Sequence, residues 1–178
     1  DYYPEYPSGG RGCQSYWASN LTFRWGHPEV LCSSQCPTLI DVDKDGKLDV
    51  VICSQGGGGF CVYNSTNGDI IHQTISYPGV RTHSQASIYD IDDDGNLEII
   101  ACRDWSYPVI WDLYLWQVDA WLPYKCYEPP AIADINGDGY VEIICCTENN
   151  ISIFNHDYQF MGNITPALSN PDNYGMSM

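Results

Sequence analysis

Positive charge and long apolar runs are both scarce in this sequence. Only 7 Lys and Arg residues stand against 23 Asp and Glu residues, so the formal net charge is −16 at pH 7. A nucleic-acid-binding protein needs a basic face to neutralise phosphates, so we exclude nucleic acid as a partner. The longest apolar stretches are short runs such as VVIC and EIICC, well below the roughly 18 residues of a transmembrane helix. We therefore expect no membrane span.

Common hydrolase signatures are also missing. None of the histidines belongs to an HExxH pair, and there is no Gly-x-Ser-x-Gly elbow. Paired acids can cleave glycosidic bonds, but most acids here fall in the repeated turns described below. We expect that the chain is not an enzyme, and a secreted polysaccharide-active enzyme is kept as a third hypothesis.

Cysteines and glycosylation sequons are abundant. The chain has 178 residues, 44% apolar and 13% aromatic, which is enough for one domain with a sizeable core. Nine cysteines and several Asn-x-Ser/Thr sequons predict an extracellular, secreted glycoprotein. The sequons are at Asn20, Asn64, Asn150 and Asn163. The disulfide candidates are Cys13, Cys32, Cys36, Cys53, Cys61, Cys102, Cys126, Cys145 and Cys146.

One motif occurs three times. The copies are PTLIDVDKDGKLDVVIC (37–53), ASIYDIDDDGNLEIIAC (86–102) and PAIADINGDGYVEIICC (130–146). Each consists of a short apolar run, an acidic turn and a second apolar run. The spacing between copies matches one four-stranded blade per repeat. The Gly-rich turn SQGGGG, the run FCVYN, the turn STNGD and the run IIHQTI complete the first blade. ISIFN and FMGNI complete the third, whereas the boundaries in the second are poorly marked.

The acidic turns carry oxygen ligands at positions 1, 3, 5 and 9. Alternate residues of a tight loop can turn their oxygens inward, and a glycine at position 6 permits the sharp bend. So many hard oxygen ligands favour Ca²⁺ over Mg²⁺ or Zn²⁺, with up to three ions in the chain. A solvated acidic turn without metal is the alternative. The predicted ligands are Asp41, Asp43, Asp45 and Asp49, then Asp90, Asp92, Asp94 and Glu98, then Asp134, Asn136, Asp138 and Glu142.

These turns are not EF-hands. An EF-hand needs a bidentate Glu at position 12 and flanking helices, but position 12 is Ile52, Ala101 or Cys145, within runs rich in β-branched residues. The acid at position 9 instead begins the second apolar strand. We therefore expect each ion to pin the turn between two strands of one blade.

At these residues the chain resembles the FG-GAP/VCBS repeat family, the calcium-loop β-propeller blades of integrin α-subunit heads and many secreted adhesins. DVDKDGKLD, DIDDDGNLE and DINGDGYVE each fit the family's loop pattern, and the resemblance covers roughly residues 37–160. It implies an all-β fold of three four-stranded antiparallel blades, a partial or open β-propeller-like array with calcium loops and extended termini. We expect an N-terminal disulfide-stapled extended segment (1–36), the repeat domain (37–165) and a C-terminal tail (166–178).

Closed propellers use about 4 to 8 blades, so something must cover the ends of a three-blade array. The remaining blades of a longer chain, the Tyr- and Pro-rich termini or neighbouring copies of the chain are the candidates, and copies docked end to end would make a filament. The chain begins at Asp1 without a start Met or signal peptide, which fits a processed chain or part of a longer one.

The cysteines and tryptophans leave alternatives open. Cys53 and Cys61 flank a Gly-rich turn and are candidates to bridge adjacent strands; Cys145 and Cys146 would face opposite sides of a strand, and an odd total permits an intermolecular bond. Trp105, Trp111, Trp116 and Trp121 would either fill space between blades or stack on sugar rings.

The function predicted from the sequence is an extracellular, calcium-stabilised structural or adhesive glycoprotein module that self-assembles into a filament or matrix. The alternative is a carbohydrate-binding, lectin-like module of a larger secreted polysaccharide-active protein, with glycans as partners.

Overall fold

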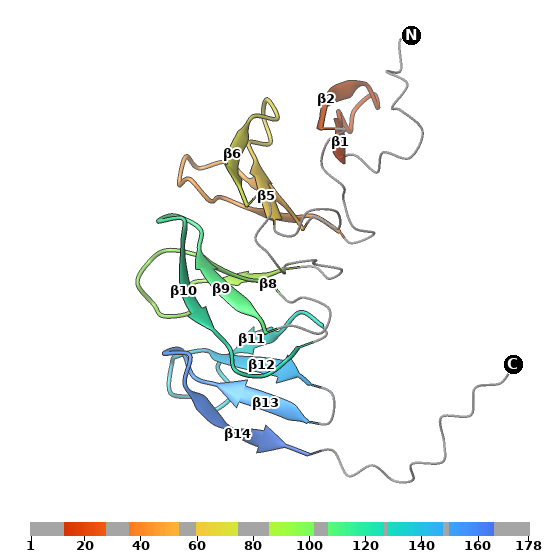
Figure 1. Cartoon of the computed structure of the whole chain (residues 1–178). Coiled ribbons are helices and arrows are strands. Elements are labelled where there is room, and N and C mark those ends of the chain that lie inside the picture. Colours follow the sequence, from red (N-terminus) through yellow and green to blue (C-terminus); the bar gives the residue numbers. More distant parts are fainter. Residues whose placement is uncertain are drawn as a thin grey trace, which may run out of the picture.

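The described part of the chain is built from β-strands alone. The computed structural model describes residues 13–27, 36–53, 60–74, 86–101, 107–126, 128–147 and 150–165. Within these residues the strands form three four-stranded antiparallel sheets and one two-stranded sheet, with no helix and no closed barrel (Figure 1). The predicted all-β fold of three open, propeller-like blades is therefore confirmed.

Blade 1 follows the first acidic loop. Its strands are β3 (Thr38–Ile40), β4 (Asp49–Cys53), β5 (Phe60–Tyr63) and β6 (Ile70–Gln73), paired in sequence order. The runs TLI, DVVIC, FCVY and IIHQ are dominated by β-branched and aromatic residues, which suit a pleated sheet packed on its faces. A β-bulge interrupts the pairing of the last two strands.

Blades 2 and 3 repeat this arrangement, including the bulge between the last two strands. Blade 2 contains β7 (Ser87–Tyr89), β8 (Glu98–Ala101), β9 (Val109–Asp112) and β10 (Gln117–Trp121). Blade 3 contains β11 (Ala131–Ala133), β12 (Glu142–Cys146), β13 (Ile151–Phe154) and β14 (Phe160–Ile164). The strands that the sequence left unmarked in the second repeat are thus β9 and β10.

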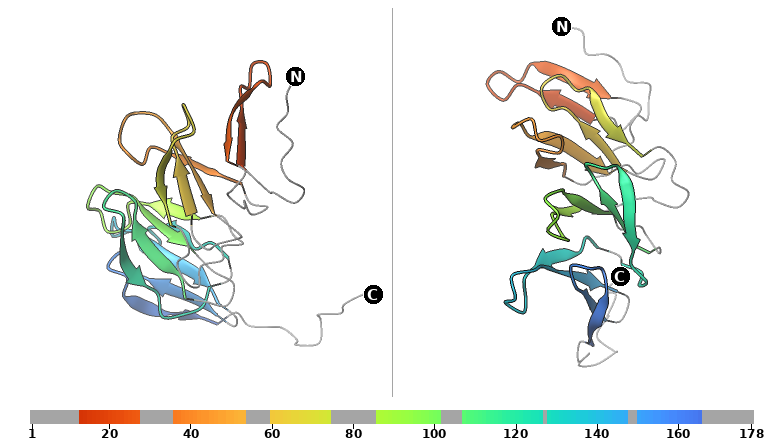
Figure 2. Two further views of the ribbon diagram at one scale, coloured as in Figure 1. Left: turned by 45° about the horizontal axis from the view of Figure 1, so that its top comes forward. Right: turned by 90° about the vertical axis from the view of Figure 1, so that its left-hand side faces the viewer.

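The N-terminal segment, expected to be extended, contains a hairpin of β1 (Cys13–Tyr16) and β2 (Phe23–His27). Figure 2 shows the hairpin beside blade 1, at the opposite end of the stack from blade 3. Trp25 packs on Ile52, Cys61 and Tyr63 of blade 1, and its indole N–H donates to the carbonyl of Ser65 at 3.1 Å. The hairpin therefore caps the first blade.

Successive blades meet through the same alternating positions. In blade 1, positions 10 and 12 (Val50, Ile52) face the hairpin, and positions 11 and 13 (Val51, Cys53) face blade 2. In blade 3, position 10 (Ile143) faces blade 2. Since side chains alternate along a strand, each blade presents one face toward the element before it (the backward face) and the opposite face toward the element after it (the forward face).

Apolar cores fill the spaces between the blades. Phe60 meets Trp111 edge-on across the junction of blades 1 and 2, with ring centroids 6.0 Å apart. Blades 2 and 3 bury Ile100, Ile110 and Phe154 together. Trp111 is buried, as the space-filling hypothesis requires, whereas Trp121 is 50% exposed; Trp105 lies outside the described residues.

One turn position, one or two residues before the last strand of each blade, reaches back to the preceding element. Gly68, Trp116 and Tyr158 occupy it, all with positive φ (82°, 56° and 63°). The Gly68 position lies against the Trp25 ring, and Trp116 stacks on His72 of blade 1 at 4.2 Å. Tyr158 packs against the core shared with blade 2. The turns therefore help to lock each blade to the element before it.

The stacked pair of His72 and Trp116 should make the junction of blades 1 and 2 sensitive to acid. Burial lowers the pKa of His72 below its ordinary value of 6.5, so the unfolded chain binds the proton more tightly than the folded chain. Stability is then complete above the ordinary pKa and falls as the pH drops through it. We expect His72→Phe, which retains a ring to stack, to lose less stability than the wild type between pH 7.5 and pH 5 in thermal unfolding. An identical pH dependence for the two proteins would contradict this assignment.

Candidate metal centres

The three acidic loops have the same internal hydrogen bonds. They are named loop 1 (41–49), loop 2 (90–98) and loop 3 (134–142), and they lie along one edge of the stack in Figure 1. The aspartate at position 1 accepts a hydrogen bond from the glycine amide at position 6 in each loop. The distances are 2.9 Å from Gly46 to Asp41, 3.1 Å from Gly95 to Asp90 and 3.0 Å from Gly139 to Asp134. The position 1 carboxylate is thus held across each turn.

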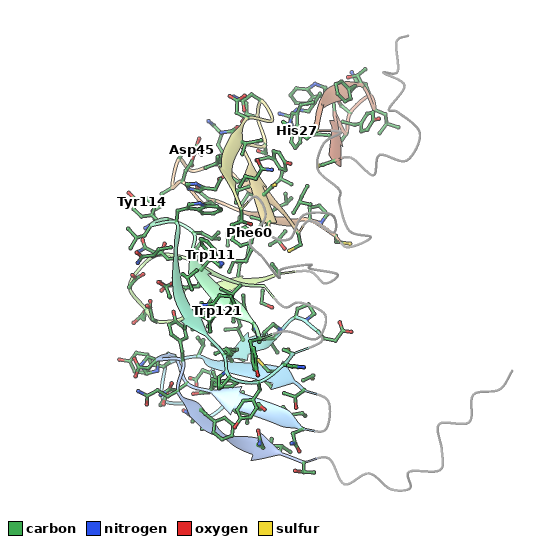
Figure 3. All side chains as sticks on the ribbon, in the orientation of Figure 1. His27, Asp45, Phe60, Trp111, Tyr114 and Trp121 are labelled. Atoms are coloured by element: carbon green, nitrogen blue, oxygen red, sulfur yellow. The ribbon has the colours of Figure 1, made fainter. Side chains whose placement is uncertain are left out.

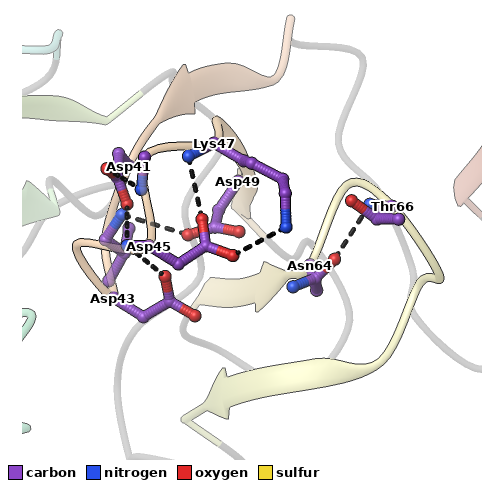
Figure 4. A network of polar contacts seen from close by, with 9 residues as sticks. Asp41, Asp43, Asp45, Lys47, Asp49, Asn64 and Thr66 are labelled. Carbon is purple, nitrogen blue, oxygen red and sulfur yellow. Dashed lines mark hydrogen bonds and ion pairs between the residues drawn. The ribbon is translucent and has the colours of Figure 1, made fainter.

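The side chains at positions 3 and 5 are also oriented by the backbone. Each accepts a hydrogen bond from the amide two residues later. For position 3 the acceptors are Asp43, Asp92 and Asn136, at 3.1, 3.3 and 2.8 Å. For position 5 they are Asp45, Asp94 and Asp138, at 2.8, 2.7 and 2.9 Å. Alternate side chains therefore turn the same way in all three loops, as Figure 4 shows for loop 1.

The acid at position 9 is buried beneath each loop. Asp49, Glu98 and Glu142 begin β4, β8 and β12, and each is only 1% exposed. One oxygen of each accepts a hydrogen bond from the position 2 amide, at 3.0, 2.6 and 2.9 Å. The acid thereby ties the start of the loop to the second strand of its blade.

Backbone conformation explains the residue types at positions 4 and 6. Position 6 is a glycine with φ of 84°, 89° or 95° in the three loops, a conformation that favours glycine. Position 4 has φ of 61° at Lys44 and Asp93 and 81° at Gly137. Two left-handed residues close together bend the chain tightly enough to gather the oxygens.

The electrostatics of the loops are those of crowded carboxylates. Burial raises the pKa of Glu98 to about 8 and also raises the pKa of Asp49. Burial and the neighbouring Asp94 raise the pKa of Asp92. At Asp45, by contrast, the backbone N–H of Lys47 lowers the pKa of the carboxyl. A cation placed among the buried carboxylates would relieve the cost of ionising them.

The residues present fit a hard cation. Oxygens of Asp41, Asp43 and Asp45 lie within 4.8 Å of one another, as do those of Asp90, Asp92 and Asp94. Oδ1 of Asp90 is buried and has no hydrogen-bond partner among the described residues, so it has a free lone pair for an ion. Loop 3 has Asn136 in place of one carboxylate and therefore offers less negative charge.

Blade 2 adds two acids that sequence reasoning missed. Asp112 and Asp119 each offer an oxygen within 4.8 Å of Glu98 and of each other. Asp112 ends β9, where blades 1 and 3 have Asn64 and Asn155, and it accepts the amides of the following turn. Asp119 lies at the bulge of β10, and burial, then the charge of Asp112, raises its pKa to about 6. Aligning the third strands would have revealed Asp112 but not Asp119.

The loops also contact neighbouring blades. Lys44 of loop 1 donates to the Gly95 carbonyl at 2.9 Å and to Asn96 Oδ1 at 3.0 Å, both in loop 2, and its ammonium lies 4.7 Å from the Tyr114 ring centroid. Figure 3 shows Asp45 and Tyr114 at the same edge of the stack. Burial and the charge of Glu98 raise the pKa of Tyr158, whose buried hydroxyl has no hydrogen-bond partner among the described residues. Tyr158 also packs against the apolar core that contains Ile91 of loop 2, so loop 2 is contacted from both neighbouring blades.

The cysteines are distributed over several environments. Cys53 packs in the core between blades 1 and 2, whereas Cys61 packs under the hairpin with Cys13 alongside. The strand pairing sets Cys53 opposite Phe60 and Cys61 opposite Ile52, so the two cysteines lie on opposite faces of blade 1. Cys145 is buried and its neighbour Cys146 is exposed, and Cys36 is also exposed. Cys32 and Cys102 lie outside the described residues.

The four sequons all lie at the surface of strands or turns. Asn20 (β1–β2 turn) and Asn163 (β14) are exposed, while Asn64 and Asn150 are half-buried. Their side-chain carbonyls accept hydrogen bonds, for example from Thr22 to Asn20 and from Ser152 to Asn163, both at 2.8 Å. Their amide nitrogens would carry the glycan.

Comparison with known proteins identifies the repeat. A family model described as FG-GAP-like repeat matches residues 41–101, which contain loops 1 and 2. The chain carries FG-GAP-like repeats. No curated protein matches the chain significantly. The described part of this FG-GAP-like chain contains no helix with the length and apolarity to cross a membrane.

Solved structures of two other proteins match parts of this chain. The crystal structure of the V. cholerae biofilm matrix protein Bap1 matches with a TM-score of 0.53 and 17% identity, over 78% of this chain and 32% of that chain. This likeness concerns the fold, and the FG-GAP-like chain spans about a third of the length of Bap1. The Photorhabdus luminescens Tc holotoxin pore matches with a TM-score of 0.34 and 15% identity, over 85% of this chain and 10% of that chain.

Proposed function

We propose that the chain is an extracellular structural or adhesive module whose blades are braced by up to three Ca²⁺ ions. The observation that carries this proposal is the threefold loop geometry, in which every predicted ligand side chain is oriented by the same backbone donors. Calcium in this role is architectural, because the acid at position 9 joins each loop to a buried strand. Sequons, cysteines and the shared fold of a biofilm matrix protein support the extracellular setting.

We also propose that the chain does not act as an enzyme. The histidines that the structure describes are engaged in ring stacking in three separate places: His27 on Tyr63, His72 on Trp116 and His156 on Tyr140. The buried acids belong to the loops or adjoin loop 2. These ring contacts support a packing role for the three histidines.

The partner proposed is another blade. The forward face of blade 3 is apolar, with Ile144, Ile151 and Ile153 half-buried and Ile164 53% exposed. By the alternation seen in blades 1 and 2, this face suits the backward face of a further blade. That blade would come from the remainder of a longer chain or from a second copy, and the second source would build a filament or matrix.

Glycan binding is a second candidate. Tyr107 and Trp121 are each 50% exposed and line a hollow of about 390 Å³ with Leu122 and Pro123. Aromatic faces of this kind stack on sugar rings. Binding of oligosaccharides that is lost in Trp121→Ala but retained in loop variants would favour this candidate.

The test of the main proposal is calcium titration with sedimentation of the glycosylated chain. We expect up to three ions to bind and chelation to lower the thermal midpoint, because each ion at a hundredfold excess over its Kd adds about 2.7 kcal/mol to the free energy of unfolding. Asp41→Asn, Asp90→Asn and Asp134→Asn should each reduce the stoichiometry. Asp157→Asn, at an exposed acid outside the loops, is the matched control.

Sedimentation distinguishes the sources of the partner. A large assembly in millimolar calcium that loosens on chelation supports self-association through the blades. A calcium-bound monomer supports a longer chain as the source of the next blade. A chain that binds no calcium and sediments identically with and without chelator would contradict the proposal.

A further inference from the structure

Two cysteines face each other in the core between blades 2 and 3. Cys126 lies in the segment that links β10 to β11, and Cys145 lies on β12 of blade 3. Both are fully buried, at 0% exposure, and both belong to the same apolar cluster. The two thiols are in hydrogen-bonding contact, and the Cys126 thiol also donates to the Glu128 carbonyl at 2.9 Å.

This pairing is specific to the third repeat. Position 12, which Cys145 occupies, is Ile52 in blade 1 and Ala101 in blade 2, so the repeat itself does not require a thiol there. The cysteine that the repeats share is at position 13, and in blade 3 that residue is Cys146, which is exposed. The repeat pattern therefore does not account for a cysteine at position 145, whereas its contact with Cys126 does.

We propose that Cys126 and Cys145 form a disulfide in the mature protein. This inference rests on the extracellular setting proposed above, because disulfides form and persist in oxidising compartments. Two thiols lose two protons and two electrons to form one S–S bond. A disulfide of an oxidoreductase or a low-molecular-weight disulfide accepts the electrons by thiol–disulfide exchange and is reduced to two thiols.

The bond forms before the core closes. In the folded chain neither sulfur is accessible, and the neighbouring Cys126 thiol and burial raise the pKa of Cys145, which disfavours the thiolate needed for exchange. Once formed in the folding chain, the bond would be shielded from reductants by the same core. It would close a loop of roughly 20 residues that contains all of loop 3, so the third loop is tied to the linker as well as to its own blade.

Peptide mapping of the secreted, non-reduced chain tests the pair directly. Alkylation followed by cleavage at aspartates separates Cys126 from Cys145, because Asp134 and Asp138 lie between them. We expect the two fragments to remain joined until reduction. Since Cys145 and Cys146 share a fragment, the matched variants decide between them: Cys146→Ala retains the joined fragments, and Cys145→Ala loses them.

A stability measurement accompanies the map. Unfolding and refolding in reductant should lower the thermal midpoint of the wild type and of Cys146→Ala by roughly 5–10 °C more than that of the double variant Cys126→Ala/Cys145→Ala. Alkylation of both thiols in the wild type, or joining of Cys126 to a different fragment, would overturn the pair. If the double variant does not fold, the maps of the wild type and Cys146→Ala still decide. Calcium binding measured on the same samples separates a failure of this disulfide from a failure of the proposed function.

Discussion

Replacing Glu98 by glutamine is expected to stabilise the calcium-free protein and to destabilise the calcium-bound protein relative to the wild type. Glu98 is 1% exposed and its pKa is raised to about 8 by burial, with Asp92, Asp94 and Asp90 adding repulsion. Between the ordinary value of 4.5 and about 8, the folded chain must hold a proton that the unfolded chain releases. Calcium-free stability therefore falls as the pH rises through this window.

The magnitude follows from the size of that window. At pH 7 the cost of keeping Glu98 in the calcium-free fold is about 3 kcal/mol, and glutamine removes it while retaining an acceptor for the Ile91 amide. We expect the thermal midpoint in chelator at pH 7 to rise by roughly 5–10 °C. With calcium present, loss of a ligand charge should weaken calcium binding at loop 2. Calcium should therefore raise the thermal midpoint of Glu98→Gln by less than that of the wild type.

Glu142→Gln in loop 3 is the matched control. Glu142 is equally buried, but both of its oxygens accept hydrogen bonds, from the Ile135 amide at 2.9 Å and from the Asn136 side chain at 2.8 Å. Because an amide has one acceptor, the variant breaks one of these bonds and should destabilise the calcium-free protein. If Glu98→Gln and Glu142→Gln change calcium-free stability in the same direction, the crowded carboxylates of loop 2 are not the cause of the effect of Glu98→Gln.

Gly68→Ala is expected to detach the hairpin cap from blade 1. A Cβ at Gly68 would lie 2.6 Å from Cγ of Trp25, and the backbone φ is +82°. The left-handed conformation costs roughly 1–2 kcal/mol with a side chain, and the overlap with the indole adds roughly 1–3 kcal/mol. Thermal unfolding should report the total, and hydrogen exchange should show residues 13–27 losing protection first.

Gly137→Ala separates the two costs. Gly137 has nearly the same φ, +81°, but nothing lies within 4 Å of its Cβ position. Its equivalents in loops 1 and 2 are Lys44 and Asp93, which carry side chains at φ of 61°. We expect this variant to lose only the stability that the left-handed backbone conformation costs. Hydrogen exchange of the hairpin (13–27) should stay unchanged. If the two variants are equally destabilised, the packing of the Trp25 ring does not require the absence of a side chain at Gly68.

The repeats were predictable because their signal is local. Loop residues at positions 1 to 9 lie close together in sequence, and each hydrogen bond described within a loop joins residues at most seven apart. The apolar runs after each loop are continuous enough to mark β4, β8 and β12. The blades therefore followed from spacing and turn chemistry.

The remaining features depend on contacts between distant segments. The hairpin was not predicted because Trp25 meets Ser65 and Gly68 some 40 residues away. The turn before β10 has no Gly or Asn; Trp116 adopts φ of 56° there with its ring stacked on His72. Asp119 approaches Glu98 through a bulge, and Cys126 meets Cys145 through a linker, and neither arrangement leaves a mark in the local sequence.

The alternation of faces also sets the unit in which such a chain can change length during evolution. Because each blade presents one set of positions backward and the next set forward, duplication or loss of a complete repeat leaves every junction with matching surfaces. An insertion of one residue within β4, β8 or β12 would exchange the two faces of that strand and spoil both junctions of its blade. Recombination in this repeat should therefore be tolerated between blades and selected against within them.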